Sequence, residues 1–368
     1  MPQSILQLAT AGVQTLVPYQ PGKPIADLER ELGLTEIIKL ASNENPLGPS
    51  EKVKEAIQAS FTDLSRYPDG NGFALKTALS AKWGVDSDQI TLGNGSNEIL
   101  ELLARAFLTI EHEVVFSQHA FAVYPLVTQA VGAQARVVPA IDYGHDLHGM
   151  LAAITDKTRL LFIANPNNPT GTYLTAQALS EFLAAVPEHV ICVLDEAYYE
   201  YVAKADYPDS IAWLAQYPNL IITRTFSKAY GLAGLRVGYS LSSAEMADIL
   251  NRVRQPFNNN SLALAAAEVA LQDTEYLAET VALNNAGMQF LSDAFTEMGL
   301  PWIASMGNFI AVDLQREANS INTALLHKGV IVRPVANYEM PNHLRISIGT
   351  KAENKFFINA LKAVLVDV

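Results

Sequence analysis

The segment Thr225–Arg236 contains a lysine in a setting that suits covalent chemistry. Lys228 follows an apolar run, has hydroxyl side chains beside it, and is followed eight residues later by Arg236. A lysine that forms a Schiff base needs partial burial, because burial lowers the pKa of its amine, and an anionic cofactor needs donors that hold it. The segment therefore predicts a Schiff-base lysine beside an anion site.

Two further segments, Asn165–Gly171 and Asp195–Tyr198, also follow apolar runs. A carboxylate at the end of a buried strand, here Asp195, can keep a heterocyclic nitrogen protonated, as pyridoxal phosphate (PLP) chemistry requires. Tyr198 can reach the same ring, and Asn168 can donate to a phenolic oxygen. Taken singly, Asp195 could be a helix cap and Asn168 part of an ordinary turn. Their order with Lys228 favours the cofactor site.

Two segments also resemble parts of nucleotide-binding motifs, but neither motif is complete. The run before Asp195 resembles a Walker B strand, but the chain has no G-x-x-x-x-G-K-[ST] segment. The segment Gly93–Glu98 could be a dinucleotide fingerprint, although Glu98 stands where its third glycine belongs. It suits a phosphate at a helix N-terminus, with Ser96 and Asn97 as donors, or equally a turn that these residues cap.

Several other side chains are candidates for the site. Phe121 and Tyr124 precede Pro125, and an aromatic residue here could stack on a flat cofactor, although such residues are more often part of the core; the other segments favour Phe121 for this role. Arg333 and Arg345 occur in apolar, strand-like segments, where a charge needs a carboxylate partner or an anionic substrate. The histidines show no metal-ligand spacing beyond His145 and His148, so we predict no metal.

The elements that must position these residues alternate between short apolar runs and helical patterns. The predicted strands are Gln89–Leu92, Glu113–Phe116, Ala135–Val138, Leu160–Ala164, Val190–Leu194 and Leu220–Thr223, with Arg236–Leu241 as a further, antiparallel one. Such alternation predicts crossover units and a mostly parallel sheet covered on both faces. Because ligands of open α/β sheets gather outside the carboxyl ends of the strands, the loops that carry Asn168, Asp195 and Lys228 should converge on one crevice.

Composition excludes several classes of partner. The chain has 368 residues, a net charge of −13 and a pI near 5.0, which argues against general affinity for nucleic acid or anionic membranes. No apolar run is long enough to span a bilayer, and Met1–Gln7 lacks the basic region of a secretory signal. The single cysteine, Cys192, suits a reducing compartment. We therefore expect a cytoplasmic protein.

The chain resembles the fold-type I PLP-dependent aminotransferases through four segments in the order Gly93–Glu98, Asn167–Gly171, Asp195–Tyr198 and Ser227–Arg236. It is similar to the histidinol-phosphate aminotransferases in particular through Leu40–Pro49, Arg66–Asp69 and Val332–Pro334. The resemblance runs from about Tyr19 to Gly349. It implies an α/β fold in which a mostly parallel, seven-stranded sheet lies between helices, with a smaller α+β domain.

The resemblance also implies roles for individual residues. Lys228 would bind PLP covalently and later remove the Cα proton of the donor, while Asp195 would pair with the ring nitrogen. The other cofactor contacts would come from Ser96, Asn97, Phe121, Asn168, Tyr198, Thr225, Ser227 and Arg236. Many relatives carry tyrosine in place of Phe121, so this chain lacks a hydroxyl there. Substrate would be bound by Tyr19, Asn43, Arg333 and Arg345, with Arg333 matching the arginine for substrate phosphate.

The domain organisation and partners follow from the same resemblance. Residues 1–40 would form an arm that packs with the small domain, residues 41–255 the large PLP-binding domain, and residues 256–368 the small domain. Tyr67 would reach the cofactor phosphate from the neighbouring subunit, which implies a homodimer with shared active sites. The expected reaction is transamination between histidinol phosphate and 2-oxoglutarate. Two alternatives stay open, an aromatic amino-acid aminotransferase acting on phenylalanine or tyrosine, and a lyase like the threonine-phosphate decarboxylases.

Overall fold

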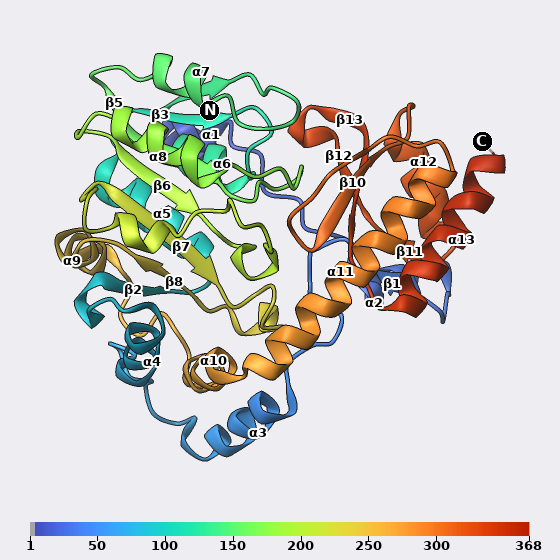
Figure 1. Ribbon diagram of the computed structural model, residues 1–368, viewed down its shortest axis with the longest axis horizontal. Coiled ribbons are helices and arrows are strands. Elements are labelled where there is room, and N and C mark those ends of the chain that lie inside the picture. Colours follow the sequence, from blue (N-terminus) through green and yellow to red (C-terminus); the bar gives the residue numbers. More distant parts are fainter. Residues whose placement is uncertain (1–3, 368) are drawn as a thin grey trace.

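The computed structural model describes residues 4–367 as a large unit built on one central sheet and a smaller unit beside it (Figure 1). The strands are β1 (Ile38–Lys39), β2 (Ile90–Gly93), β3 (Glu113–Ser117), β4 (Gln134–Val138), β5 (Thr158–Ala164), β6 (Ile191–Asp195), β7 (Leu220–Thr225), β8 (Gly238–Leu241), β9 (Trp302–Ile303), β10 (Phe309–Asp313), β11 (Val330–Ile331), β12 (Arg333–Val335) and β13 (Met340–Ser347). The helices are α1 (Ala11–Gln14), α2 (Ile25–Leu32), α3 (Glu51–Ala59), α4 (Phe73–Trp83), α5 (Ser96–Phe107), α6 (Val123–Ala130), α7 (Leu147–Ala152), α8 (Ala176–Ala185), α9 (Ala244–Val253), α10 (Ser261–Gln272), α11 (Thr274–Glu297), α12 (Ala318–His327) and α13 (Lys351–Asp367).

The large sheet has seven strands in the order β2-β8-β7-β6-β5-β3-β4. Parallel pairing joins the five strands β3, β4, β5, β6 and β7. β8 runs antiparallel to both of its neighbours, β7 and β2. The predicted fold class and the antiparallel direction of the strand within 236–241 are confirmed. That strand begins two residues later than predicted, because Arg236 has a left-handed backbone (φ 56°) and lies in the loop that leads into β8.

Both faces of the sheet are buried, which explains why its strands are apolar runs without alternation. On one face, Leu161 and Ile163 of β5 pack with residues of α4, α7, α8 and α10. On the other face, Leu160 and Phe162 pack with residues of α5, α6 and α9. Successive residues of one strand thus serve two separate cores, and the strand is fixed between them.

The smaller unit has a four-stranded antiparallel sheet in the order β12-β13-β10-β9, covered by α11, α12 and α13. The N-terminal segment joins it, because β1 pairs in parallel with β11 and Leu28 of α2 packs against Ile331. Earlier in the chain, however, α1 contacts α6 of the large unit. Of the predicted arm, residues 1–3 lie outside the described residues.

Helix α10 belongs with the large unit by its contacts. Its alanines Ala263, Ala266, Ala267 and Ala270 are part of the core that packs against the large sheet, and it lies against α3 and α4. α11 then leads from that position to the smaller unit, and Figure 1 shows it crossing between them in orange. The predicted domain division at residue 256 stays a prediction, and these contacts favour a boundary closer to Asp273, between the two helices.

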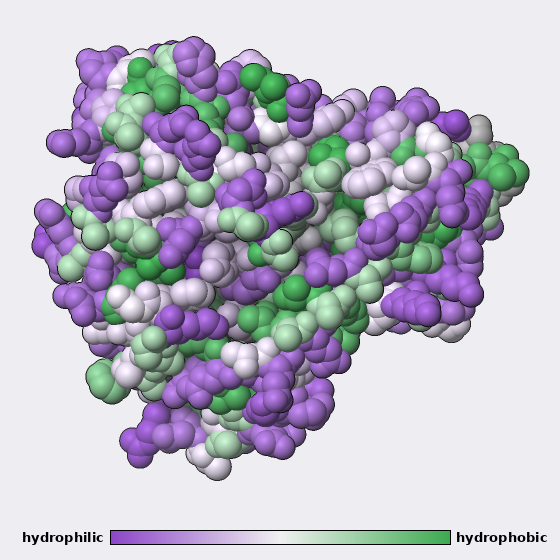
Figure 2. Space-filling model, in the orientation of Figure 1, coloured by the Kyte–Doolittle hydropathy of each residue, from purple (hydrophilic) through white to green (hydrophobic). Residues whose placement is uncertain are grey.

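The surface is mixed in character. Figure 2 shows hydrophilic residues over most of the visible face, with apolar residues gathered beside the part of α11 next to the large unit. Among residues 4–367, no helix combines the length and the apolar character needed to cross a membrane.

Candidate active site

A cavity of about 380 Å³ lies at the carboxyl ends of the large sheet's strands and is bounded on the other side by the smaller unit and the N-terminal segment. Its walls include every residue predicted to bind cofactor or substrate within one chain, from Tyr19 to Arg345. These predicted residues are Tyr19, Asn43, Ser96, Asn97, Phe121, Asn168, Asp195, Tyr198, Thr225, Ser227, Lys228, Arg236, Arg333 and Arg345. Those from the large unit meet because the loops after β2, β3, β5 and β6, and the loop that joins β7 to the antiparallel β8, all emerge at one edge of the sheet, while Tyr19, Asn43, Arg333 and Arg345 come from the N-terminal segment and the smaller unit.

Lys228 lies in the loop between β7 and β8, with its amine buried inside the cavity. Nζ donates to the carbonyl oxygen of Ser42 at 3.2 Å. Burial and the positive charges of Arg345 and Arg236 lower the pKa of the Lys228 amine to about 8, although Glu44 and Asp195 oppose this shift. A larger share of the amine is therefore neutral near pH 7 than for an ordinary lysine. A neutral amine can act as a nucleophile and as a base.

Asp195 ends β6, and two hydroxyls hold its carboxylate. Tyr124 donates to Oδ2 at 2.9 Å, and Thr223 on the neighbouring strand β7 donates to Oδ1 at 3.1 Å. Burial raises the pKa of Asp195, while both hydrogen bonds act in the opposite direction by stabilising the charged form. The result is a carboxylate of fixed orientation that faces the cavity and can pair with a cationic ring nitrogen.

One end of the cavity is built to receive an anion. Helix α5 begins at Ser96, and its N-terminal N–H groups carry the positive end of the helix dipole. Gly95 has φ 74°, and a Cβ on it would lie 2.5 Å from Nη2 of Arg236. Only glycine therefore lets the guanidinium reach this helix end. Arg236 Nη1 also donates to Ser227 Oγ at 3.2 Å, so backbone, guanidinium and hydroxyl donors converge.

The opposite side of the cavity is tied to the smaller unit through Arg345 on β13. Arg345 donates through Nη1 to Asn168 Oδ1 at 2.5 Å and through Nη2 to the carbonyl oxygen of Ala41 at 2.7 Å. Its buried Nε has no partner in the described structure. The guanidinium therefore retains a donor for an anionic ligand, and one of its present partners, Asn168, is itself a candidate cofactor ligand.

Tyr198 and Asn43 form a second contact between the two sides. Asn43 Nδ2 donates to the Tyr198 hydroxyl at 2.9 Å, and Asn43 has a left-handed backbone (φ 54°). Ser347 Oγ accepts from Asn43 N–H at 2.7 Å and fixes this turn. Burial raises the pKa of Tyr198, with Arg345 and the Asn43 hydrogen bond opposing the shift. Tyr198 is therefore a neutral phenol and can donate a hydrogen bond.

Arg333 and Tyr19 lie at the solvent-facing side of the cavity. The Arg333 guanidinium lies 5.5 Å from the centre of the Tyr19 ring and donates through Nη2 to the carbonyl oxygen of Gln20 at 2.7 Å. Tyr19 is 48% exposed. The pair forms a partly open wall of the cavity. The Arg333 donors that do not bond to Gln20 can bind an anionic group of a ligand there.

Tyr67 does not line the cavity of its own chain. It is 82% exposed, and its ring stacks on Phe257 with 4.6 Å between the ring centres. Its assignment to a neighbouring subunit's site stays a prediction.

Four polar residues that contribute to the site had no role assigned from the sequence as ligands or as partners of Asp195. Ser42 and Glu44 line the cavity beside Asn43, and Tyr124 and Thr223 hold Asp195. The first two adjoin a predicted residue within Leu40–Pro49, which was a usable signal. Thr223 belongs to a predicted strand and stands two residues before Thr225, a predicted site residue. Because residues two apart in a strand point to the same face, a place for Thr223 near the site could have been inferred. Nothing in the spacing of Tyr124 indicated a contact with Asp195.

Known proteins resemble this chain in sequence and in structure. The family model described as "Aminotransferase class I and II" matches residues 35–361. Histidinol-phosphate aminotransferase 2 of Pseudomonas fluorescens is 64% identical over 367 residues, with 99% of each chain covered. Histidinol-phosphate aminotransferase 1 of Idiomarina loihiensis is 59% identical over 357 residues, with 97% of each covered. The crystal structure of histidinol-phosphate aminotransferase from Sinorhizobium meliloti in complex with pyridoxal-5'-phosphate has a TM-score of 0.90 and 32% identity, with 97% of each chain covered.

Proposed function

The chain belongs to the aminotransferase class I and II family, and on this premise we propose that it transfers the amino group of histidinol phosphate to 2-oxoglutarate with PLP as cofactor. The observation that carries the proposal is the content of one cavity. It combines a lysine with a lowered pKa, a buried aspartate, and an anion cradle formed by the α5 N-terminus and Arg236. Two further arginines, Arg333 and Arg345, lie across from them.

The residues present fit PLP. The space that Gly95 leaves beside Arg236 and the N-terminus of α5 suits the cofactor phosphate, with Thr225 and Ser227 as further donors. Asp195 would pair with the ring nitrogen, Phe121 would cover a ring face, and Asn168 and Tyr198 would donate to the phenolic oxygen. When bound, PLP supplies an electrophilic carbon for the donor amine and a ring that accepts the electron pair of the broken Cα–H bond.

The chain's own residues then bind the substrate and move the proton. Lys228 takes the Cα proton on Nζ in its neutral form, which its lowered pKa makes more available than in an ordinary lysine, and it later returns the proton to complete the transfer. Asp195 stays ionised and keeps a proton on the ring nitrogen. Arg345 binds the carboxylate of the oxo acid through its guanidinium, and Arg333 binds the phosphate of histidinol phosphate.

Donor preference tests this assignment. In the PLP-loaded protein we expect histidinol phosphate to react with a kcat/KM at least about 10-fold above those of phenylalanine and tyrosine, because a charge-assisted contact to phosphate is worth about 1.5–3 kcal/mol. Arg333→Leu should remove most of this preference and change the rate with phenylalanine by less than about threefold. The measurement is the loss of the cofactor's absorbance after each donor is added.

The exposed Arg316, which lies outside the cavity, provides the matched control, and Arg316→Leu should keep the preference. Faster reaction with phenylalanine or tyrosine than with histidinol phosphate would instead support the aromatic aminotransferase. Release of carbon dioxide without need for an oxo acid would support the lyase.

We further propose a homodimer in which each site takes Tyr67 from its partner. The support is the exposure of Tyr67 and of its stacking partner Phe257, together with three exposed apolar side chains near Tyr67 in the sequence, namely Phe61, Leu64 and Phe73. Exposed apolar side chains that gather in one part of a chain often mark a contact with another protein.

Mixing two defective chains tests the shared site. Lys228→Ala and Tyr67→Ala each impair every site of their own homodimers, but a mixed dimer has one site with both native residues. After unfolding and refolding together at equal amounts, the mixture should regain about a quarter of wild-type activity, because half of the dimers are mixed and each has one intact site of two. Sedimentation should show twice the mass of one chain. Activity no higher than the mean of the two parents would mean that each site is built from a single chain.

A further inference from the structure

Tyr124 on α6 contacts two residues to which the proposed function gives roles in cofactor binding. Its hydroxyl donates to Asp195 Oδ2 at 2.9 Å. Its ring lies edge-on to Phe121, with 5.8 Å between ring centres and 86° between planes. No residue of α6 is among those predicted for the site, and Tyr124 itself does not line the cavity.

We infer that Tyr124 is a positioning residue that holds the Asp195 carboxylate in its ionised, ring-facing orientation while its ring supports Phe121. The inference rests on the proposed function, since it assigns the same cofactor to the same cavity. Tyr124 would act on the cofactor only through these two neighbours.

The surroundings of Tyr124 keep its hydroxyl in place. The side chain is fully buried (0% exposed) and stacks face to face on Phe162 of β5, with 4.6 Å between ring centres and 5° between planes. Thr128, one helical turn later, donates to the backbone carbonyl of Tyr124 at 2.7 Å. Because the ring cannot swing without disrupting the sheet core, the direction of its O–H is set by the fold.

The carboxylate of Asp195 depends on such donors because it is buried. Burial raises its pKa, and the neighbouring negative charge of Glu196 acts in the same direction. Tyr124, Thr223 and the backbone N–H of Ala197 oppose that shift by donating to the charged form. Removing the Tyr124 hydroxyl takes away one of the hydrogen bonds that stabilise the charged form, so the carboxyl of Asp195 should take up a proton at a higher pH.

The remaining groups near Asp195 fix the sign of the expected pH effect. Lys228 faces it across the cavity as a cation that favours the ionised carboxylate, and the neutral phenol of Tyr198 lies alongside. A protonated Asp195 cannot pair with a protonated ring nitrogen. Affinity for PLP should therefore fall as the pH drops through the pKa of Asp195, and this fall should begin at a higher pH once the Tyr124 hydroxyl is gone.

The test compares Tyr124→Phe with Tyr239→Phe in cofactor-free protein. Both changes remove one hydroxyl from a buried tyrosine, but the Tyr239 hydroxyl accepts from Trp83 Nε1 at 3.0 Å, away from Asp195. PLP titrations between pH 5 and pH 9 measure the dissociation constant. For Tyr124→Phe we expect about a tenfold increase at neutral pH and a loss of affinity that begins about one pH unit higher. Tyr239→Phe should keep the wild-type pH profile.

Each outcome decides between clear alternatives. Unchanged PLP affinity and an unchanged pH profile in Tyr124→Phe would overturn the inference while leaving the proposed function intact. Failure of the wild-type protein to bind PLP would instead overturn the proposed function itself. If Tyr124→Phe does not fold, Thr223→Val removes the other hydroxyl donor on Asp195, and it must shift the pH profile in the same direction for the inference to stand.

Discussion

Lys228→Ala is expected to lower kcat by at least about 10⁴-fold while the protein keeps its fold, because the general base and the covalent anchor of the cofactor are lost together. The fold should survive because the amine makes a single hydrogen bond, to the carbonyl oxygen of Ser42, and lines a cavity rather than a packed core. Removing a buried cation also removes the cost of its desolvation. Steady-state turnover with histidinol phosphate and 2-oxoglutarate measures the first effect, and far-UV circular dichroism measures the second.

A second buried lysine provides the control. Burial lowers the pKa of Lys76, as it does for Lys228, but Lys76 lies on α4 and does not line the cavity. Lys76→Ala should therefore leave turnover within about threefold of wild type, since it removes no group that touches substrate or cofactor. Wild-type-like turnover in Lys228→Ala would contradict the assignment of this lysine as the catalytic base.

Much of the site could be predicted because its residues follow strands in the sequence. Lys228, Asp195 and Asn168 each stand just beyond an apolar run, and parallel strands bring their carboxyl ends to one edge of a sheet. The anion cradle was also predictable from Gly93–Glu98, because a glycine turn before a helix exposes free N–H groups. Local sequence and sheet topology together were sufficient for these residues.

Other parts of the structure depend on packing that one sequence does not reveal. The contact between Tyr124 and Asp195 joins a helix to a strand 71 residues away, and no periodicity encodes it. The alanine-rich helix α10 has the same pattern whether it covers the large sheet or the smaller one, so residue 256 is a poor marker of the change between units. Its place follows from contacts with α3 and α4, which form only in the folded chain.

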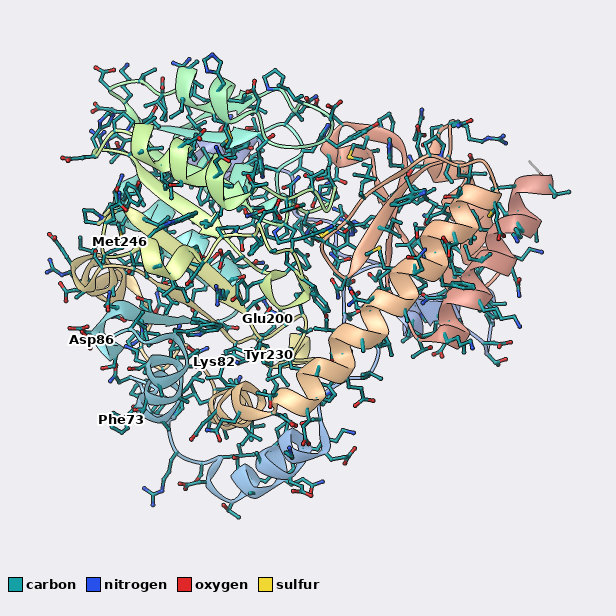
Figure 3. All side chains as sticks on the ribbon, viewed as in Figure 1. Phe73, Lys82, Asp86, Glu200, Tyr230 and Met246 are labelled. Atoms are coloured by element: carbon teal, nitrogen blue, oxygen red, sulfur yellow. The ribbon has the colours of Figure 1, made fainter. Side chains whose placement is uncertain are left out.

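The partners of Arg224 also could not be inferred from the sequence. This residue has no predicted role, and its side chain is nearly inaccessible at 1% exposure. Its neighbours Thr223 and Thr225 face the candidate site, so strand alternation turns Arg224 to the opposite face of the sheet. There its guanidinium lies 4.3 Å from the centre of the Trp83 ring and 3.6 Å from that of Tyr199. Figure 3 shows Lys82, Glu200 and Tyr230 in the same region, between α4 and the start of α11.

This arginine neutralises a buried carboxylate. Arg224 donates to Glu196 Oε2 from Nε at 2.9 Å and from Nη2 at 2.7 Å, and Ser210 donates to Glu196 Oε1 at 2.6 Å. Arg224→Met should lower the free energy of unfolding by about 3–5 kcal/mol, because it leaves Glu196 charged and unpaired in the interior. Urea unfolding followed by circular dichroism at pH 8 measures the loss.

The pH dependence and a double variant identify the cause of that loss. Burial raises the pKa of Glu196, and Arg224 opposes the shift, so the pKa should rise further in Arg224→Met. Burial also raises the pKa of Glu200 to about 7, and Arg224 opposes this shift too, so the pKa of Glu200 should rise as well when the arginine is removed. Both carboxyls take up protons as the pH falls, so the destabilisation should be smaller at pH 6 than at pH 8.

Adding Glu196→Gln to Arg224→Met should recover most of the lost stability, since no unpaired charge then remains. Equal destabilisation in the single and double variants, independent of pH, would mean that stacking of the guanidinium between Trp83 and Tyr199 contributes more than its charge.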